Sequence, residues 1–143
     1  MSHTYVPPKR KTKVVFVQLG SPEAPTPKAL RKYLRNFLGD PRVIDIPAWK
    51  WKIILNCFVL PTRPAKSAKL YERIWDGKSF PLITNTENFT NGVREELKKI
   101  DPEGYVEVNH AFLLSPPYVN EVYDSWEEDL KNNVGATKLM VIP

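Results

Sequence analysis

The chain of 143 residues is poor in the residues that build metal sites and covalent cross-links: it has one cysteine, Cys57, and two histidines, His3 and His110. A single cysteine excludes a disulfide within the chain. Zinc and iron–sulfur sites need several thiolate or imidazole ligands, and two histidines far apart in the sequence do not supply them. We therefore expect no metal ligands in this chain.

Other signals are missing as well. Residues 1–12 form a polar, basic tail without an apolar segment, so we expect no signal peptide and a cytoplasmic protein. No basic stripe is interleaved with exposed aromatic residues, which disfavours nucleic acid as a partner. Only Gly20 stands in the first predicted strand-to-helix turn, where a dinucleotide-binding site needs three glycines.

The charge balance is modest, with 21 basic and 16 acidic side chains and a net charge of +5. This excess is compatible with an anionic ligand, with a negatively charged membrane surface, or with an ordinary solvated surface. Charge alone therefore does not select a function.

The apolar run over residues 14–19, followed by Gly20, Ser21 and Pro22, predicts a buried parallel strand that ends in a loop. Ligands bind at this edge of open α/β sheets. Further strands are predicted over residues 105–114 and 137–143. We expect an α/β fold with a parallel sheet and flanking helices, forming one domain over residues 13–143. A buried-type strand at the end leaves an open sheet edge, so we also expect more protein beyond Ile142.

Helices are predicted between these strands. The first begins at Pro27, capped by Thr26, and ends before Gly39. The remaining predicted helices cover residues 49–60, 65–75 and 86–100, and a last one begins at Pro116 or Pro117 with Ser115 as its cap.

The segment over residues 49–60 is apolar almost all round and lies between Pro47 and Pro61. Twelve residues give about 18 Å of helix, against about 20 residues needed to cross a bilayer, so the segment does not span a membrane. Two interpretations stay open. The helix is either buried in the core, or it lies at an interface with Trp49, Trp51 and Phe58 in the headgroup region.

Four blocks, at residues 15–27, 33–43, 60–68 and 71–82, resemble in this order the N-terminal half of ferrochelatases. The resemblance implies one of two similar α/β halves that enclose a porphyrin, and a metal-chelating lyase that inserts Fe²⁺ into the macrocycle in haem biosynthesis. Fe²⁺ and the porphyrin, protoporphyrin IX or coproporphyrin III, are then substrates, and this half binds no cofactor of its own.

The resemblance also implies roles for particular residues. Porphyrin-binding positions match the four residues Leu19, Arg63, Tyr71 and Ser79. An arginine suits a propionate because its guanidinium binds a carboxylate through two hydrogen bonds. The hydrophobic lip of the porphyrin cleft, which in this family also meets the membrane, matches Trp49, Trp51, Ile54, Phe58 and Leu60. The lip would place the protein peripherally at the inner membrane face.

Some positions depart from the family pattern. The turn before Pro81 is one residue longer than the family's Gly-Ser-Pro, and Phe112-Leu113 replaces an Arg-Tyr pair. The family's catalytic histidine and glutamate belong to the other half, and His110 does not align with that histidine. We interpret His110 as a strand histidine with its hydrogen bonds satisfied.

Two functions follow. By the first, which the resemblance implies, the chain is the N-terminal half of a ferrochelatase and stays inactive until the remaining chain, a separate polypeptide or a homo-oligomeric partner supplies the catalytic residues. Alternatively, it is a non-catalytic module that holds porphyrin or haem or docks at a membrane.

Overall fold

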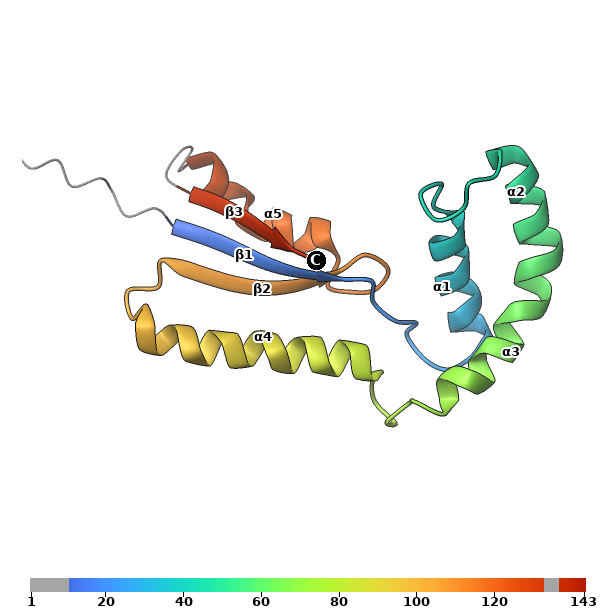
Figure 1. The fold of residues 1–143 in the computed structure, drawn as a ribbon, viewed down its shortest axis with the longest axis horizontal. Helices are drawn as coiled ribbons and strands as arrows, with labels where there is room; N and C mark the ends of the chain where they lie inside the picture. Colours follow the sequence, from blue (N-terminus) through green and yellow to red (C-terminus); the bar gives the residue numbers. More distant parts are fainter. Residues whose placement is uncertain (1–10, 133–136) are drawn as a thin grey trace, which may run out of the picture. The chain divides into compact units, whose positions relative to one another are not determined.

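The computed structural model describes residues 11–132 and 137–143, and the chain divides into two compact units. Unit 1 contains the sheet and comprises residues up to Gln18, 86–113 and 117–143, while unit 2 comprises residues 19–85 and 114–116. Most of the predicted basic tail lies outside the described residues. The α-helices and strands are labelled in Figure 1. In chain order the elements are β1 (Lys11–Gln18), α1 (Pro27–Gly39), α2 (Ala48–Ile54), the π-helical segment η1 (Leu55–Val59), α3 (Leu60–Glu72), α4 (Pro81–Ile100), β2 (Val106–Phe112), α5 (Val119–Asn132) and β3 (Thr137–Ile142).

The sheet of unit 1 has the strand order β2-β1-β3, and both pairings are parallel. In the central strand, Val15 lies opposite Asn109 of β2 and Val141 of β3. The predicted α/β class with a parallel sheet is therefore confirmed, and all three predicted strands are present.

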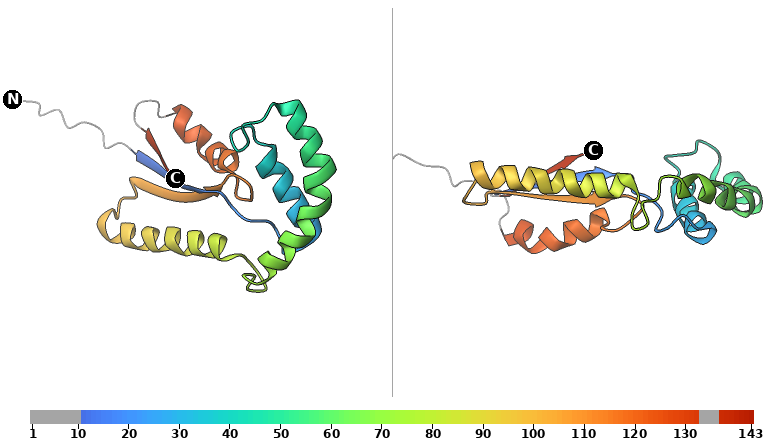
Figure 2. Two further views of the ribbon diagram at one scale, coloured as in Figure 1. Left: turned by 45° about the vertical axis from the view of Figure 1, so that its right-hand side comes forward. Right: turned by 90° about the horizontal axis from the view of Figure 1, so that it is seen from below.

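Helices α4 and α5 cover opposite faces of this sheet (Figure 2). On one face, Phe16 of β1 meets Phe89 of α4 edge to face, with ring centroids 5.0 Å apart. On the other, Val15 packs in a buried cluster with Val122 and Trp126 of α5. Successive side chains of a strand point to opposite faces, which explains why Val15 and Phe16 contact different helices.

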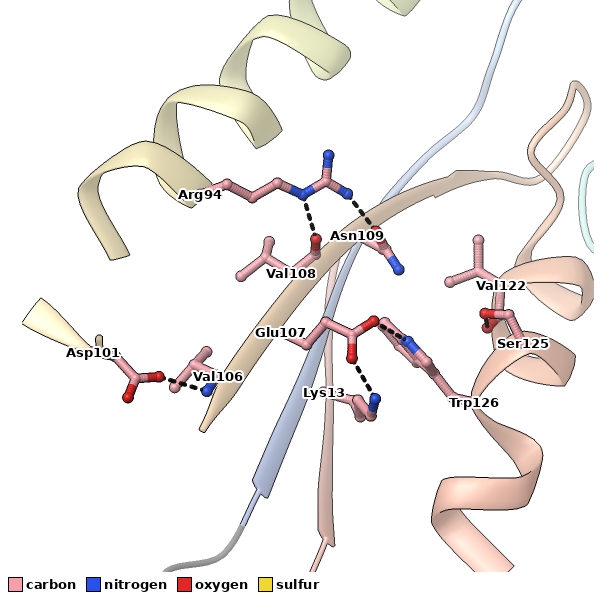
Figure 3. Close-up of polar contacts among 10 residues, drawn as sticks. All are labelled: Lys13, Arg94, Asp101, Val106, Glu107, Val108, Asn109, Val122, Ser125 and Trp126. Carbon is pink, nitrogen blue, oxygen red and sulfur yellow. Dashed lines mark hydrogen bonds and ion pairs between the residues drawn. The ribbon is translucent and has the colours of Figure 1, made fainter. Parts of the chain in front are cut away.

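A polar cluster lies within the α5 face (Figure 3). Lys13 is buried in β1 and pairs with the carboxylate of Glu107, its neighbour in β2. The other oxygen of Glu107 accepts a 2.6 Å hydrogen bond from the indole Nε1 of Trp126. The ammonium of Lys13 also lies 5.5 Å from the centroid of that ring. The three side chains join both strands to α5 and give a buried charge a partner.

Two side chains, Arg94 in α4 and Asp101 directly after it, bind backbone groups on the outer edge of β2 (Figure 3). The carboxylate of Asp101 accepts a 2.7 Å bond from the amide of Val106, and Nε of Arg94 donates a 2.7 Å bond to the carbonyl of Val108. An exposed strand edge offers unpaired backbone groups to other strands. These bonds occupy two of those groups on β2.

In unit 2, helix α1 begins and ends close to the predicted positions. Thr26 is its N-cap and accepts a 3.2 Å bond from the amide of Ala29, and Pro27 occupies the first turn. Gly39 is the last helical residue instead of the first one after the helix. The apolar side of α1, including Leu30 and Tyr33, is buried.

Residues 48–72 form an uninterrupted run of helical turns, so the predicted break at Pro61 is wrong. The π-helical turn explains how proline is accommodated: the amide of Leu60 bonds the carbonyl of Leu55, five residues back. Side chains bind two further carbonyls, since Thr62 Oγ1 donates to Phe58 (2.7 Å) and Asn56 Nδ2 donates to Lys52 (2.7 Å).

Three predicted helix boundaries are also wrong. Helix α3 ends at Glu72 rather than at residue 75, and α4 begins at Pro81, five residues early. Helix α5 begins at Val119, after a bent segment at residues 113–117 and an isolated bridge between Phe112 and Tyr118, in which the amide of Phe112 bonds the carbonyl of Pro117. Ser115 therefore caps no helix.

We predict that Glu107→Ala lowers the free energy of unfolding by about 2 to 3 kcal/mol, because it removes a carboxylate from beside the buried ammonium of Lys13. Denaturant unfolding followed by circular dichroism measures the change. The double variant Lys13→Met/Glu107→Leu should recover most of the loss. In the control, Glu95→Ala, which breaks an exposed pair with Lys98, should cost about 0.5 kcal/mol or less. Equal losses in Glu107→Ala and the control would contradict this interpretation.

Candidate functional site

The four predicted porphyrin-binding residues, Leu19, Arg63, Tyr71 and Ser79, all lie in unit 2. They come from the end of β1, from helix α3 and from the loop before α4. The geometry around each one shows which of them share a site.

Leu19 follows β1 directly and keeps 39% of its surface exposed. Gly20 then adopts a positive φ of 91°, which favours glycine because it has no Cβ. The turn is held from a second segment: the amide of Leu114 donates to the carbonyl of Leu19 (3.0 Å), and the amide of Ser21 donates to Oγ of the buried Ser115 (3.3 Å). Leu19 is thus an exposed aliphatic group on a turn fixed by hydrogen bonds.

Tyr33 of α1 connects this turn to α3. Its hydroxyl donates a 3.3 Å hydrogen bond to the carbonyl of Gly20, and its ring lies 6.4 Å from that of Tyr71. Burial, followed by the charge and the hydrogen bonding of Tyr71, raises the pKa of Tyr33 to about 12. The neutral phenol is therefore the form that this site stabilises.

Tyr71 belongs to an aromatic cluster. Its ring meets Phe80 edge to face at 5.4 Å, and Phe80 meets Trp75 in the same manner at 4.6 Å. Phe80 is only 2% exposed, while Tyr71 and Trp75 are half-buried. The cluster provides flat apolar surface of the kind that suits a planar aromatic ligand.

Ser79 lies in a turn held by Asp76, whose carboxylate accepts hydrogen bonds from the amides of Ser79 (2.5 Å) and Lys78 (2.8 Å). These two bonds hold the pKa of Asp76 below its usual value. Beside the turn is a cavity of about 140 Å³ with aromatic, hydroxyl and charged walls. Its lining comprises Pro22, Glu23, Trp75, Lys78, Ser79, Phe80, Ile83, Ser115 and Pro116.

Arg63 is exposed on α3, eight residues before Tyr71. Eight residues of helix span about 12 Å, and Arg63 is not among the residues that line the cavity. No carboxylate in the described part of the chain forms an ion pair with it. Its five N–H donors are available to an anion.

The predicted lip residues divide into two groups. Trp49 and Phe58 are each 66% exposed, and Ile54 is partly exposed beside the exposed Ile53. Lys50 extends its ammonium to 5.4 Å from the ring centroid of Trp49. These side chains form an exposed apolar surface, which we call the α2 surface: Trp49, Ile53, Ile54 and Phe58.

Trp51 and Leu60 do not belong to this surface. The indole of Trp51 donates a 2.6 Å hydrogen bond to the carbonyl of Leu38 in α1, and Leu60 is 1% exposed. Both side chains pack inside unit 2. Trp51 and Leu60 therefore attach the helical run to the rest of unit 2. Because Leu60 is buried, it does not fit the predicted position facing the membrane.

His110 lies in β2, as predicted, but its hydrogen bonding differs from the prediction. Its Nδ1 is buried and has no hydrogen-bond partner among the described residues. Burial lowers the pKa of His110, with Glu87 opposing the shift and Arg94 adding to it. No cluster of three His, Cys, Asp or Glu side chains with metal-binding geometry occurs within residues 11–132 and 137–143.

Several site residues were not identified from the sequence. The sequence does not single out Tyr33, Trp75, Lys78 or Phe80 as parts of a site. The sequence around the turn at residues 76–80 is rich in aromatic residues, which is a sign of a site. Nothing in the spacing of residues 33, 71 and 80 shows that their rings meet. The contact depends on how α1 packs against α3.

Known sequences that are similar to this chain agree with the resemblance seen in its four sequence blocks. The sequence model of the family described as Ferrochelatase matches residues 11–143. Three similar curated proteins, each named ferrochelatase, come from Thioalkalivibrio sulfidiphilus, Nitrosomonas europaea and Chromobacterium violaceum. They are 40%, 38% and 37% identical to this chain over 130, 133 and 141 residues.

These alignments cover 91%, 93% and 99% of this chain, but only 34%, 35% and 36% of the relatives. The chain therefore spans about a third of the length of the curated relatives that it matches. The matched portion contains every residue of the candidate site.

We predict that the stability of unit 2 falls in alkaline solution because the folded state raises the pKa of Tyr33 from 10.0 to about 12. The contribution of the neutral phenol is complete below pH 10 and is lost as the pH rises through about 12. Spectrophotometric titration near 295 nm should show a late-ionising step from Tyr33. That late step should vanish in Tyr33→Phe and persist in Tyr123→Phe, which replaces an exposed ring of α5. A late step retained in Tyr33→Phe would contradict the assignment.

Proposed function

The chain belongs to the ferrochelatase family, and on that premise we propose that it supplies one porphyrin-binding wall of an enzyme that inserts Fe²⁺ into a porphyrin during haem biosynthesis. The observation that carries the proposal is the aromatic cluster of Tyr71, Phe80 and Trp75 beside the cavity at Ser79. Flat apolar surface next to hydroxyl and cationic groups suits a macrocycle that carries carboxylates.

Each residue has a distinct part in this proposal. Leu19 presses on the ring as an aliphatic group that cannot ligate iron. Ring distortion of this kind exposes the pyrrole nitrogens to the metal, and a basic group then accepts the pyrrole protons. Arg63 binds a propionate, while Ser79 and Tyr71 donate hydrogen bonds to the ligand.

Further residues have to complete the site. The chain spans about a third of the length of its relatives, and the described residues contain no cluster of three metal-ligating side chains. In the proposal, Fe²⁺ and porphyrin are substrates, and the groups that handle the metal and the protons come from the remaining length or from a partner chain.

A spectroscopic experiment tests this division of labour. The chain is titrated with protoporphyrin IX or coproporphyrin III, and the Soret band is recorded before and after anaerobic addition of Fe²⁺. We expect a shift on porphyrin binding and no metallation. Metallation by this chain alone would contradict the need for further residues, and an absent shift would contradict the porphyrin-binding wall itself.

We predict that Arg63→Ala weakens porphyrin binding by about tenfold or more, since a charge-assisted hydrogen bond is worth about 1.5 to 3 kcal/mol. Arg63→Lys should recover only part of the affinity, because lysine loses the bidentate geometry. Fluorescence quenching of the porphyrin measures both. Arg73→Ala, at an exposed position just after α3, is the matched control and should bind normally. Equal affinity in Arg63→Ala and the control would remove Arg63 from the site.

We further propose that the α2 surface rests on a lipid bilayer. Trp49 and Phe58 are exposed apolar groups, and Lys50 and Lys52 flank them. Aromatic rings favour the headgroup region, where lysine side chains extend toward water or anionic lipid. No helix in the described part of the chain has the length and hydropathy to cross a membrane, so the proposal concerns peripheral contact.

We predict that Trp49→Ala/Phe58→Ala reduces binding to vesicles of phosphatidylglycerol and phosphatidylcholine by at least about tenfold, since each buried large side chain contributes about 1.5 to 3 kcal/mol. Co-sedimentation with the vesicles measures the bound fraction. The control Leu70→Ala/Ile74→Ala removes two exposed apolar groups outside the α2 surface and should bind like the unsubstituted chain. If the control loses as much binding, the contact does not depend on the α2 surface.

A further inference from the structure

Helix α1 has one side composed of basic residues. Lys28, Arg31 and Arg35 are exposed there, spaced by three and four residues, and Lys32 lies between them. Residues with this spacing lie along one side of a helix. The exposed positions of α1 include no acidic residue, because the helix contains none. We call Lys28, Arg31 and Arg35 the α1 basic stripe.

Contacts within the described chain leave most of this charge unneutralised. Lys32 pairs with Glu23 at 2.5 Å, whereas Lys28, Arg31 and Arg35 form no ion pair with any described residue. Their side chains line a shallow hollow of about 320 Å³, and Arg35 also lines an adjoining one of about 540 Å³ that reaches Arg42. The stripe is therefore open to an anionic partner.

The position of the stripe is unfavourable for the helix itself. Lys28 lies in the first turn of α1, and this turn has no acidic residue. The helix dipole favours negative charge at that end. Helix stability thus does not explain the choice of residue, which suggests that the charge has an external counterpart.

Helix α5 carries a matching set of opposite charges. Glu121, Asp124 and Glu128 are exposed and have the same spacing of three and four residues. In each set of three, the first and last residues are seven positions apart, which is about 10 Å along a helix. Neither Asp124 nor Glu128 forms an ion pair with a basic residue of the described chain. We call Glu121, Asp124 and Glu128 the α5 acidic stripe.

From this match we propose that the α1 basic stripe of one copy binds the α5 acidic stripe of a second copy. The two stripes have equal length, equal spacing and opposite sign, so one helix laid beside the other brings each basic group to a carboxylate. A membrane fits the α1 stripe less well, because apart from Pro27 its exposed positions offer no apolar side chain to enter the headgroup region.

The geometry determines how the association should behave. Each copy uses two different surfaces, so the contact is heterologous and produces growing assemblies unless a ring closes. Exposed ion pairs are weak and are screened by salt, with a Debye length of about 30 Å at 0.01 M and about 3 Å at 1 M. Association through apolar surfaces, by contrast, would not weaken as salt is added.

Sedimentation velocity of the chain tests the proposal directly. At an ionic strength of about 0.01 M, the weight-average mass should rise with protein concentration, and at about 0.5 M it should return to that of the monomer. A mass that is independent of salt, whether monomeric or oligomeric, would overturn the proposal.

Charge reversal identifies the surfaces. Lys28→Glu/Arg31→Glu/Arg35→Glu and, separately, Asp124→Lys/Glu128→Lys should each weaken self-association by at least about tenfold, the equivalent of about 1.4 kcal/mol. Mixing the two variants should restore association, because each then meets a stripe of opposite sign. Lys66→Glu/Lys69→Glu, on the exposed part of α3, is the control and should associate like the unsubstituted chain.

Circular dichroism of every variant establishes that it is folded before its mass is measured. If the mixture of folded variants stays monomeric at low salt, or if the control loses association equally, the two stripes do not bind each other.

Discussion

The parallel hydrogen bonding of β1 to a strand on each side is the constraint on which the rest of unit 1 depends. It holds Lys13 beside Glu107 and Phe16 beside His110, and it determines which helix each side chain of β1 meets. A shift of one residue would turn every side chain to the other face. Lys13 would then lose Glu107 and the indole of Trp126, and the buried charge would be left without these partners. The polar cluster therefore specifies the register as well as joining α5 to the sheet.

Hydrogen bonds between separate segments also organise unit 2. Tyr33 binds the carbonyl of Gly20, Trp51 binds the carbonyl of Leu38, and Ser115 accepts from the amide of Ser21. Each bond joins segments that are distant along the chain. Together they position the turn after β1 and the aromatic cluster at Tyr71, so the candidate site relies on a few directed contacts.

Proline and threonine together explain the helical run between residues 48 and 72. Pro61 lacks the amide that an α-helix would use, and a π-helical turn removes the need for it. Thr62 then binds the carbonyl of Phe58 through its side chain. The turn places Phe58 outward and Leu60 inward, and this separates an exposed apolar surface from a buried anchor within three residues.

Fold class, strand number and the cap at Thr26 could be predicted because they depend on local patterns: β-branched runs, helix-capping residues and apolar periodicity. The family could be identified because its blocks occur in order along the chain. Two helix ends near proline could not be predicted. Pro61 predicts the end of a helix and Pro116 the start of one, yet Pro61 lies within helical turns and Pro116 precedes a helix by three residues.

The sequence by itself therefore determined the α/β class with its parallel sheet, the start of α1, and the family to which the chain is similar, since each depends on the order and spacing of residues. Only the tertiary structure decided which aromatic rings meet at Phe80, that Trp51 and Leu60 turn inward, and that the buried Nδ1 of His110 has no hydrogen-bond partner among the described residues. These outcomes depend on the packing of segments far apart in the chain, which side-chain periodicity does not encode.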